Sequence, residues 1–209
     1  MAYDLDEQEK VDALKDWWKR NGNTVVWGLA LAAALAAGIQ GWRYYQKSQL
    51  QQAAAVYDVV QKSLQSKDIK KAREAAGQVM EKYPSTPYAA RAALLAAAAN
   101  YEAGDAKSAK AQLQWANDHA KEDGARDEAR LNLAAILLDE KNYDEALKLL
   151  TSPASPAFAA LYADLRGDVL QAQGKSADAR AAYKTALEKL DQKSGYRQLV
   201  QIKLDALGG

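Results

Sequence analysis

The stretch DLRGDVLQAQGKSADARAAYKTAL, residues 164–187, decides the fold, because it contains one complete helical hairpin. Its apolar and small residues recur every three or four positions, which predicts two amphipathic helices on either side of a Gly-Lys-Ser turn. Gly167 in the first helix and Ala179 at the start of the second have small side chains, and Tyr183 and Ala186 continue the second helix. Small residues at these points predict that the two helices cross closely.

The same design occurs four times along the chain. Polar turns at 66–72, 103–109, 140–146 and 173–179 separate apolar segments, and the turns follow one another at intervals of 37, 37 and 33 residues. This spacing is close to the 34-residue tetratricopeptide unit. Pro153 and Pro156 end the second helix of the third unit early. Each turn ends on an alanine at the predicted helix crossing: Ala72, Ala109, Ala146 and Ala179.

The last segment of the chain is predicted to cover the end of this array. Tyr196, Leu199, Ile202 and Leu207 fall on one apolar helix face. A helical repeat array needs such a terminal cap, because its last unit otherwise exposes apolar surface.

A second stretch, NGNTVVWGLALAAALAAGIQGW at residues 21–42, has no charged residue between Arg20 and Arg43. About 20 mostly apolar residues are enough for a helix to cross the hydrocarbon core of a membrane. Trp27 lies toward one end of the stretch and Trp42 at the other, as is typical of aromatic side chains at the two membrane interfaces. We therefore predict a single uncleaved membrane anchor that leaves membrane lipid in contact with residues 21–45.

Two other interpretations of this stretch stay open from the residues alone. A cleaved signal peptide needs a short basic leader, whereas residues 1–20 hold six acidic and four basic side chains. The sequence ALA at 34–36 is nevertheless a conceivable cleavage site. A helix buried inside a soluble protein is the other alternative.

These patterns predict an all-α protein with a single N-terminal transmembrane helix followed by a tetratricopeptide-like helical-repeat solenoid. The expected parts are an amphipathic segment at 1–20, a transmembrane helix at 21–45 and a repeat domain at 46–209. Asp4 or Asp6 is the expected N-cap of the first segment. Basic residues before and after the span favour a cytoplasmic N-terminus only slightly. With no helix breaker but Gly41 between residues 39 and 66, the span is expected to run on into the first repeat.

Gly28, Ala32 and Ala36 follow one another at intervals of four residues within the span. Small side chains at this spacing let another membrane helix approach closely. We expect these three residues to form a membrane-helix contact, although alanine is also simply a good helix former.

No group of residues in the sequence suggests catalysis, a metal site or a bound cofactor. The chain has no cysteine and one histidine, and it lacks the glycine-rich phosphate-binding and nucleophile motifs. Its net charge of +1 shows no basic excess of the kind that nucleic-acid binders carry. We therefore expect neither an enzyme nor a nucleic-acid partner.

Stacked helical hairpins form a concave surface that binds peptides or proteins, and the first helix of each unit lines it. Aligning the units predicts which side chains face this groove, although each of them is as easily explained by packing. The predicted partner-binding groove residues are Arg91, Leu94, Tyr101, Leu131, Leu138, Leu161, Asp164 and Gln171.

Several strings in order along the chain resemble one known family. VDALKDWWKRNGN precedes the span, GWRYYQKSQLQQA follows it, and FAALYADLRGDVLQAQGKSADARAAYKTAL contains the last hairpin. Together they resemble the ancillary SecYEG translocon subunits, the YfgM family of bacterial inner-membrane proteins. The resemblance covers essentially the whole chain.

The resemblance implies a cytoplasmic N-terminus, periplasmic repeats and a non-catalytic role at the Sec translocon. The implied partners are the SecYEG translocon, the membrane-anchored periplasmic chaperone PpiD and the secretory proteins that emerge from the channel. An adaptor that docks this chaperone is the function we favour. A chaperone that holds unfolded secreted chains directly, or a scaffold for another cell-envelope complex, would use the same features.

Overall fold

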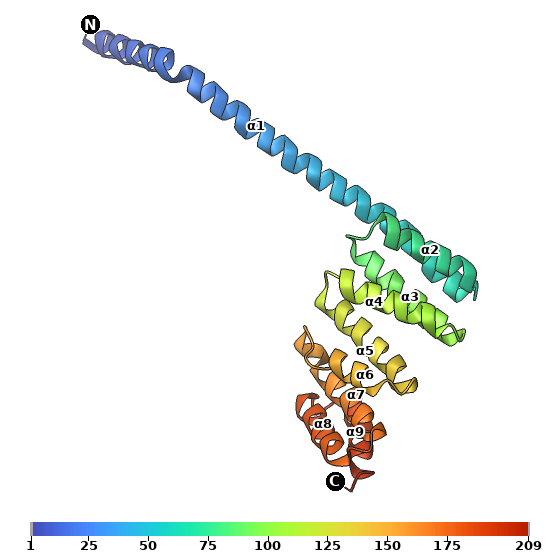
Figure 1. The fold of residues 1–209 in the computed structure, drawn as a ribbon. Coiled ribbons are helices and arrows are strands. Elements are labelled where there is room, and N and C mark those ends of the chain that lie inside the picture. Colours follow the sequence, from blue (N-terminus) through green and yellow to red (C-terminus); the bar gives the residue numbers. More distant parts are fainter. Residues whose placement is uncertain (1, 209) are drawn as a thin grey trace. The chain divides into compact units, whose positions relative to one another are not determined.

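The fold comes from a computed structural model that describes residues 2–208, with side chains described for residue 7 and residues 9–208. The expected N-cap at Asp4 or Asp6 lies outside the described side chains. The chain divides into two units, residues 1–48 and residues 49–209, which we describe separately. Every regular element in the described part of the chain is a helix, which confirms the all-α prediction (Figure 1).

The first unit consists of helix α1, which spans Ala2–Gln65 and so continues into the second unit. The predicted continuation of the span into the first repeat is thus confirmed as one helical segment. Among the described residues, α1 is the one helix long and apolar enough to cross a membrane, by its length and composition. Its most apolar window has a mean hydropathy of 1.6, and 6% of that window is buried by other parts of the protein. The large side chains of the window therefore have no protein core to cover them.

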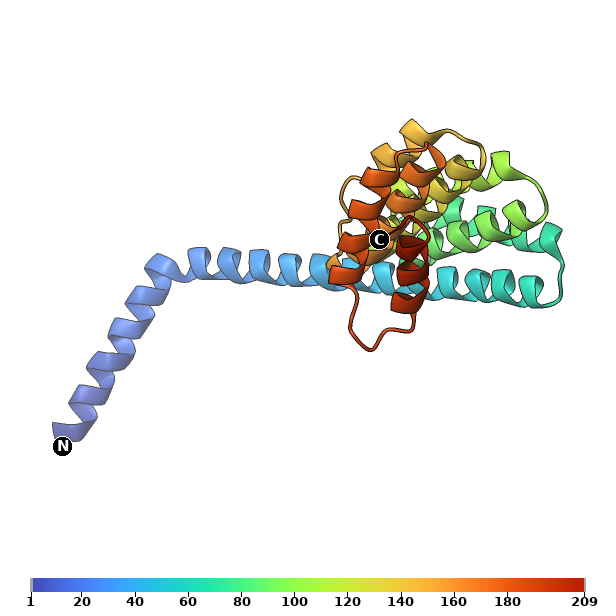
Figure 2. The ribbon, with the colours of Figure 1, turned by 90° about the horizontal axis from the view of Figure 1, so that it is seen from below.

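Helix α1 bends in its first third, in the blue part of the ribbon (Figure 2). Asn21 Nδ2 donates a hydrogen bond to the carbonyl oxygen of Trp17 at 3.1 Å, and Arg20 Nε donates to that of Asp16 at 3.3 Å. Side-chain donors at these carbonyls compete with the backbone N–H groups four residues on, which is a known cause of helix bending. The expected boundary between the segments 1–20 and 21–45 stays a prediction, although these two contacts lie beside it.

The second unit is a stack of antiparallel hairpins (Figure 1). The end of α1 pairs with α2, α3 with α4, α5 with α6, and α7 with α8, while α9 packs on the last hairpin. The bounds of the helices are α2 Ile69–Lys82, α3 Pro87–Glu102, α4 Ala106–His119, α5 Asp123–Asp139, α6 Tyr143–Leu149, the 3-10 helix η1 Pro156–Phe158, α7 Ala159–Ala172, α8 Ser176–Lys189 and α9 Tyr196–Asp205.

The four turns share one backbone geometry, which explains why the repeat is visible in the sequence. In the second turn, the Asp105 N–H bonds to the Asn100 carbonyl at 2.8 Å and the Gly104 N–H bonds to the Tyr101 carbonyl at 2.9 Å. This is the Schellman pattern, in which the residue after the helix adopts a positive φ. The residues in that conformation are Lys67 (φ 59°), Gly104 (φ 82°), Lys141 (φ 62°) and Gly174 (φ 79°).

The alanines that end the four predicted turns lie in the core. Ala72, Ala109, Ala146 and Ala179 are each fully buried. Valines complete the contact in the first hairpin, where Val60 of α1 and Val79 of α2 are also fully buried. Each such valine stabilises the fold by about 1.5–3 kcal/mol through the apolar surface that it removes from water.

Two further expectations about packing can be compared with the structure. Helix α6 ends at Leu149, before the two prolines, as the sequence predicts. The expected apolar face of α9 is only half right. Val200 and Leu204 are its buried residues, whereas Leu199 and Ile202 are 47% and 58% exposed. Residues three and four apart both repeat on a helix face, so the sequence alone did not separate these two neighbouring faces.

Candidate functional site

The candidate site is the surface formed by the first helices of successive hairpins. Between α3 and α5 it contains a hollow with a cavity volume of about 260 Å³. Ala97 and Tyr101 contribute from α3, Asn132 and Ile136 contribute from α5, and Leu113 of α4 also lines the hollow. Small and apolar side chains line most of this hollow, so it can accept an apolar side chain of a partner.

Tyr101, a predicted groove residue, lies at this hollow and is 40% exposed. Its hydroxyl donates a hydrogen bond to Asp139 Oδ2 of α5, which joins the two neighbouring first helices. The hydrogen bond to the carboxylate stabilises the protonated phenol and raises the pKa of Tyr101 above its ordinary value. The ring therefore has a fixed orientation and offers its exposed face to a partner.

The other predicted residues of α3 and α5 differ in accessibility. Arg91 is exposed, and its guanidinium lies 3.1 Å from the carboxylate of Glu122 at the start of α5. Leu131 and Leu138 are partly buried and pack on the central core, whereas Leu94 is only 7% exposed and belongs to that core. Of these four, Arg91 is thus the most available to a partner and Leu94 the least.

The predicted residues of α7 are drawn into contacts with the end of the array. Asp164 is 3% exposed and accepts hydrogen bonds from the Tyr196 hydroxyl at 2.5 Å and from Lys203 Nζ at 2.9 Å. Gln171 is exposed, and its Oε1 lies 2.9 Å from the hydroxyl of the buried Tyr183. Leu161 is half-buried. The Asp164 carboxylate therefore holds α9 in place, and a partner on the surface cannot reach it without displacing α9.

Lys203 is the centre of this network. Its ammonium group also lies 2.7 Å from Asp168 Oδ2. Burial opposes the charge of Lys203, but the hydrogen bonds to Asp168 and Asp164 outweigh this effect and raise the pKa of the ammonium group. For the phenol of Tyr196, burial and the Asp164 carboxylate both raise the pKa. At neutral pH the network thus places one charged lysine and two tyrosine hydroxyls around two carboxylates.

The membrane-helix contact predicted at Gly28, Ala32 and Ala36 lies on an exposed part of α1. A Cβ atom added at Gly28 would meet no other atom within 4 Å. The small residues therefore have no packing partner within the described chain, and the contact with another membrane helix stays a prediction.

The described side chains form no cluster of candidate metal ligands. Among residue 7 and residues 9–208, no three side chains of His, Cys, Asp or Glu come together. The single histidine, His119, stacks on Trp115 with ring centroids 4.4 Å apart, and its Nδ1 lies 2.9 Å from the Trp115 carbonyl oxygen. Trp115 in turn packs against two of the core clusters. His119 and Trp115 are thus both held by contacts within the fold.

Asp127 and Asp139 are two acidic residues that the sequence did not single out. Asp139 fixes Tyr101, and Asp127 is fully buried and holds the segment 151–155 by hydrogen bonds. Both bonds join residues 27 or more positions apart. Helical periodicity carries no information on such distant pairs, so no signal in the sequence could have found them.

Comparison with known proteins places these features in context. A family model described as a tetratricopeptide repeat-like domain matches residues 15–209. A relative in Neisseria gonorrhoeae is 36% identical over 99% of this chain and 100% of its own length, and one in Haemophilus influenzae is 31% identical over the same shares. A relative in Escherichia coli is 26% identical over 96% of both chains. All three are described as ancillary SecYEG translocon subunits.

A solved structure, from the functional characterisation of Pseudomonas aeruginosa pilF, shares the fold. It superimposes with a TM-score of 0.60 and 18% identity, and covers 77% of this chain and 69% of its own. At this identity the likeness supports the helical-repeat architecture and nothing about the partners.

Proposed function

Because this chain belongs to the family of ancillary SecYEG translocon subunits, which are not enzymes, we propose that it is an inner-membrane adaptor of the translocon. In this role it uses its repeat surface to bind a periplasmic chaperone, PpiD, and so assists proteins that leave the channel. Its N-terminus lies in the cytoplasm, residues 21–45 cross the membrane and the repeats at 46–209 lie in the periplasm.

One observation supports this proposal most strongly. The relatives in Neisseria gonorrhoeae and Haemophilus influenzae match over their entire length, so the match includes both the apolar segment and the repeats of this chain. A repeat domain alone would fit many adaptors, because repeat surfaces bind diverse partners. The exposed apolar window of α1 and the hollow beside Tyr101 then supply the anchor and the docking surface that such an adaptor needs.

The first test is purification of the complex from native membranes after crosslinking. We expect the full-length protein to recover SecYEG subunits together with PpiD. A variant that lacks residues 1–45 would show which partner the anchor recruits. Recovery of a mixture of secretory proteins would instead indicate a chaperone in its own right, and recovery of another envelope complex would indicate a scaffold.

The contribution of the membrane helix can be tested with matched leucine substitutions. We expect Gly28→Leu, Ala32→Leu and Ala36→Leu together to lower recovery of SecYEG several-fold, because bulky side chains prevent close approach of another helix. Ala30→Leu and Ala34→Leu are the control, since these positions lie on the opposite side of the same helix. Equal recovery from both variants, with equal membrane insertion, would contradict a small-residue contact.

The groove is tested by Tyr101→Ala, with Gln78→Ala as the control on an exposed site of α2. Loss of the exposed ring is expected to lower recovery of PpiD while leaving SecYEG bound through the anchor. An equal yield of PpiD from both variants would move the chaperone site away from this hollow.

Orientation is measured by cysteine labelling, because the chain has no cysteine of its own. We expect a membrane-impermeant maleimide to label Gln78→Cys in intact spheroplasts and to label Asp12→Cys only after the membrane is opened. The reverse pattern would overturn the proposed topology.

A further inference from the structure

The array is irregular at one place, the third hairpin. Its second helix, α6, has 7 residues, whereas α2, α4 and α8 have 14 each. Instead of completing the helix, the chain turns through the segment 151–155 into η1. The surface that the second half of α6 would occupy is therefore left open.

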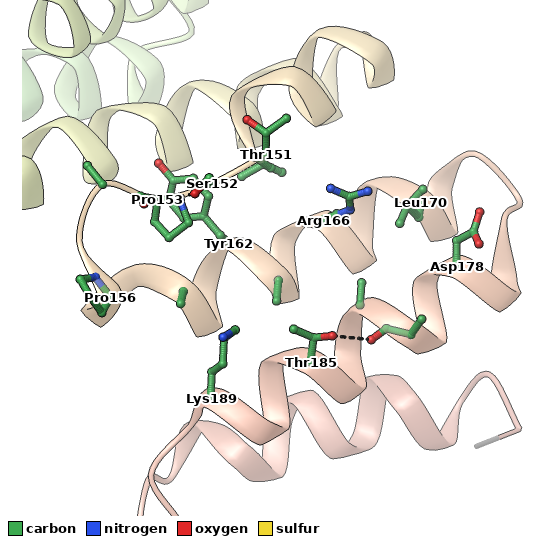
Figure 3. A pocket seen from close by; sticks show the side chains of 16 residues that line it. Thr151, Ser152, Pro153, Pro156, Tyr162, Arg166, Leu170, Asp178, Thr185 and Lys189 are labelled. Atoms are coloured by element: carbon green, nitrogen blue, oxygen red, sulfur yellow. Dashed lines mark hydrogen bonds between the residues drawn. The ribbon is translucent and has the colours of Figure 1, made fainter.

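A cleft with a cavity volume of about 820 Å³ lies beside the shortened helix (Figure 3). Residues of α7 and α8 that recur every three or four positions line it, and the segment from Leu150 to Pro156 completes it. A helix with side chains is about 10 Å across and rises 1.5 Å per residue, so seven residues occupy roughly 800 Å³. The cleft thus has room for the seven residues by which α6 is shorter than the other second helices.

The lining of the cleft suits a helix. Ala159 and Ala163 of α7 and Ala181 and Ala182 of α8 present methyl groups, which let another helix approach closely. The α7 and α8 backbones use their own N–H and C=O groups within the helices, so they cannot pair with an extended peptide. A helical ligand satisfies its backbone internally and needs no such partners.

Asp127 orders the remaining wall of the cleft, the segment from Leu150 to Pro156, before any ligand binds. Its two carboxylate oxygens accept hydrogen bonds from the N–H groups of Ala154 at 2.9 Å and Ser155 at 2.7 Å, and from the Tyr162 hydroxyl at 2.9 Å. The N–H groups of Ala154 and Ser155 are therefore occupied as well. A wall that is already ordered reduces the entropy lost when a ligand binds.

Three charged side chains line the cleft and lack a partner. Arg166, Asp178 and Lys189 form no ion pair or hydrogen bond with any described residue, whereas Arg91 and Lys110 are paired with carboxylates on neighbouring elements. Asp178 lies in the first turn of α8 and Lys189 in its last. A docked helix that is parallel to α8 and replaces the seven missing residues would place its negative C-terminal end toward Lys189.

We propose that this cleft docks a short helix of a partner protein, two to three turns long and parallel to α8, with apolar or small side chains toward the alanines and a carboxylate toward Arg166. The occupant replaces the missing half of α6. This surface is separate from the groove beside Tyr101, so its existence does not depend on the proposed translocon role.

The test uses a photoreactive p-benzoylphenylalanine at Thr185, which lines the cleft, in the full-length protein in its own membranes. The control is the same residue at Gln78, since both positions follow the crossing alanine of their helix by six residues. We expect a dominant adduct from Thr185 that is absent from Gln78. Mass spectrometry of the adduct should locate the crosslink in one partner segment with helical periodicity and a central acidic residue.

A synthetic 16-residue peptide with the crosslinked sequence is then titrated against the full-length protein. We expect the peptide to gain helical circular dichroism on binding, and Arg166→Glu to weaken binding at least tenfold. Lys184→Glu, an exposed site of α8 outside the cleft lining, should change binding less than twofold.

Three results would overturn the proposal: no adduct at Thr185 above the Gln78 level, adducts spread over many unrelated sequences, or a peptide that binds without helix or without dependence on Arg166. Recovery of SecYEG by the same protein would be unaffected by any of them, so failure here is distinguishable from failure of the adaptor function.

Discussion

Replacing Gly167 by alanine tests the closest contact between two helices in the array. A Cβ atom at this position would lie 2.4 Å from Cε1, 2.5 Å from Cδ1 and 2.9 Å from Cζ of Tyr183. Carbon atoms in contact are normally about 3.5–4.0 Å apart, so the added methyl group overlaps the ring by about 1 Å. Either the ring must move or α7 and α8 must separate.

The ring of Tyr183 has little freedom to move. It is fully buried, and its hydroxyl lies 2.8 Å from Asp168 Oδ1 and 2.9 Å from Gln171 Oε1. Rotation would break these contacts, so the two helices must separate instead. Forcing an extra methyl group into a packed core costs about 1–3 kcal/mol, and more where the site is rigid. The higher helix propensity of alanine offsets about 1 kcal/mol of this loss in the free energy of unfolding.

The net loss in the free energy of unfolding is therefore about 2 kcal/mol, taking the rigid end of that range. For a domain of this size, each kcal/mol lowers the Tm by about 2–4 °C, so we expect a decrease of about 4–8 °C. The assay is urea and thermal unfolding of the full-length protein in detergent, followed by circular dichroism. Hydrogen exchange measured by mass spectrometry should show the faster exchange in α7, α8 and α9.

Gly77→Ala is the matched control, because a Cβ atom added in the middle of α2 meets nothing within 4 Å. It should stabilise the protein by about 0.5–1 kcal/mol through helix propensity alone. In a Tyr183→Ala background, Gly167→Ala should lose its cost, because the overlapping ring is absent. If Gly167→Ala raised the Tm as Gly77→Ala does, the predicted pairing of Gly167 with Tyr183 would be refuted.

Three other perturbations have expected outcomes. Lys141→Gly should raise the free energy of unfolding by about 1 kcal/mol in urea melts, because only glycine adopts the positive φ at this turn without strain; Lys141→Ala should give no such gain. Asp127→Asn should lower the free energy of unfolding by about 2 kcal/mol and speed hydrogen exchange in 151–158, because an NH2 donor replaces one of the two oxygens that accept hydrogen bonds from backbone N–H groups. Unchanged exchange would exclude this anchoring role. The free energy of unfolding should fall as pH rises above about 10, because the raised pKa values of Lys203 and Tyr196 mean that the folded state binds more protons than the unfolded chain. Lys203→Met should remove the contribution of Lys203 to this pH dependence, as measured by urea melts between pH 8 and 11.

The sequence predicts the parts of this fold that depend on local periodicity. The four buried alanines, the early end of α6 and the small residue at position 167 all follow from spacings within about 40 residues. The glycines at 104 and 174 likewise indicate the positive φ that Lys67 and Lys141 adopt in the equivalent turns. Because the same geometry recurs in each unit, the residue at a position in one unit predicts the structure at the equivalent position in the others.

The candidate site is less predictable, because it depends on contacts between units. Asp164 illustrates the difficulty: its position in the repeat places it on the groove side, but Lys203 and Tyr196, 39 and 32 residues later, occupy its carboxylate. Periodicity also left the neighbouring faces of α9 unseparated, so Val200 and Leu204 were missed as its buried residues. A groove residue can thus be assigned only after the helix that follows it has been placed.

The third hairpin shows why a departure from repetition is informative about binding. In a regular array, each second helix covers the helices of the next unit, so an uninterrupted array would leave no cleft between α6 and α8. The prolines that shorten α6 remove this cover, yet the buried carboxylate of Asp127 keeps the replacing segment ordered. A segment that merely failed to form a helix would need no buried anion, whose desolvation is costly unless its hydrogen bonds compensate for it. The ordered wall, the unpaired Arg166 and the volume of the missing turns therefore favour a cleft that receives a helix from outside the chain.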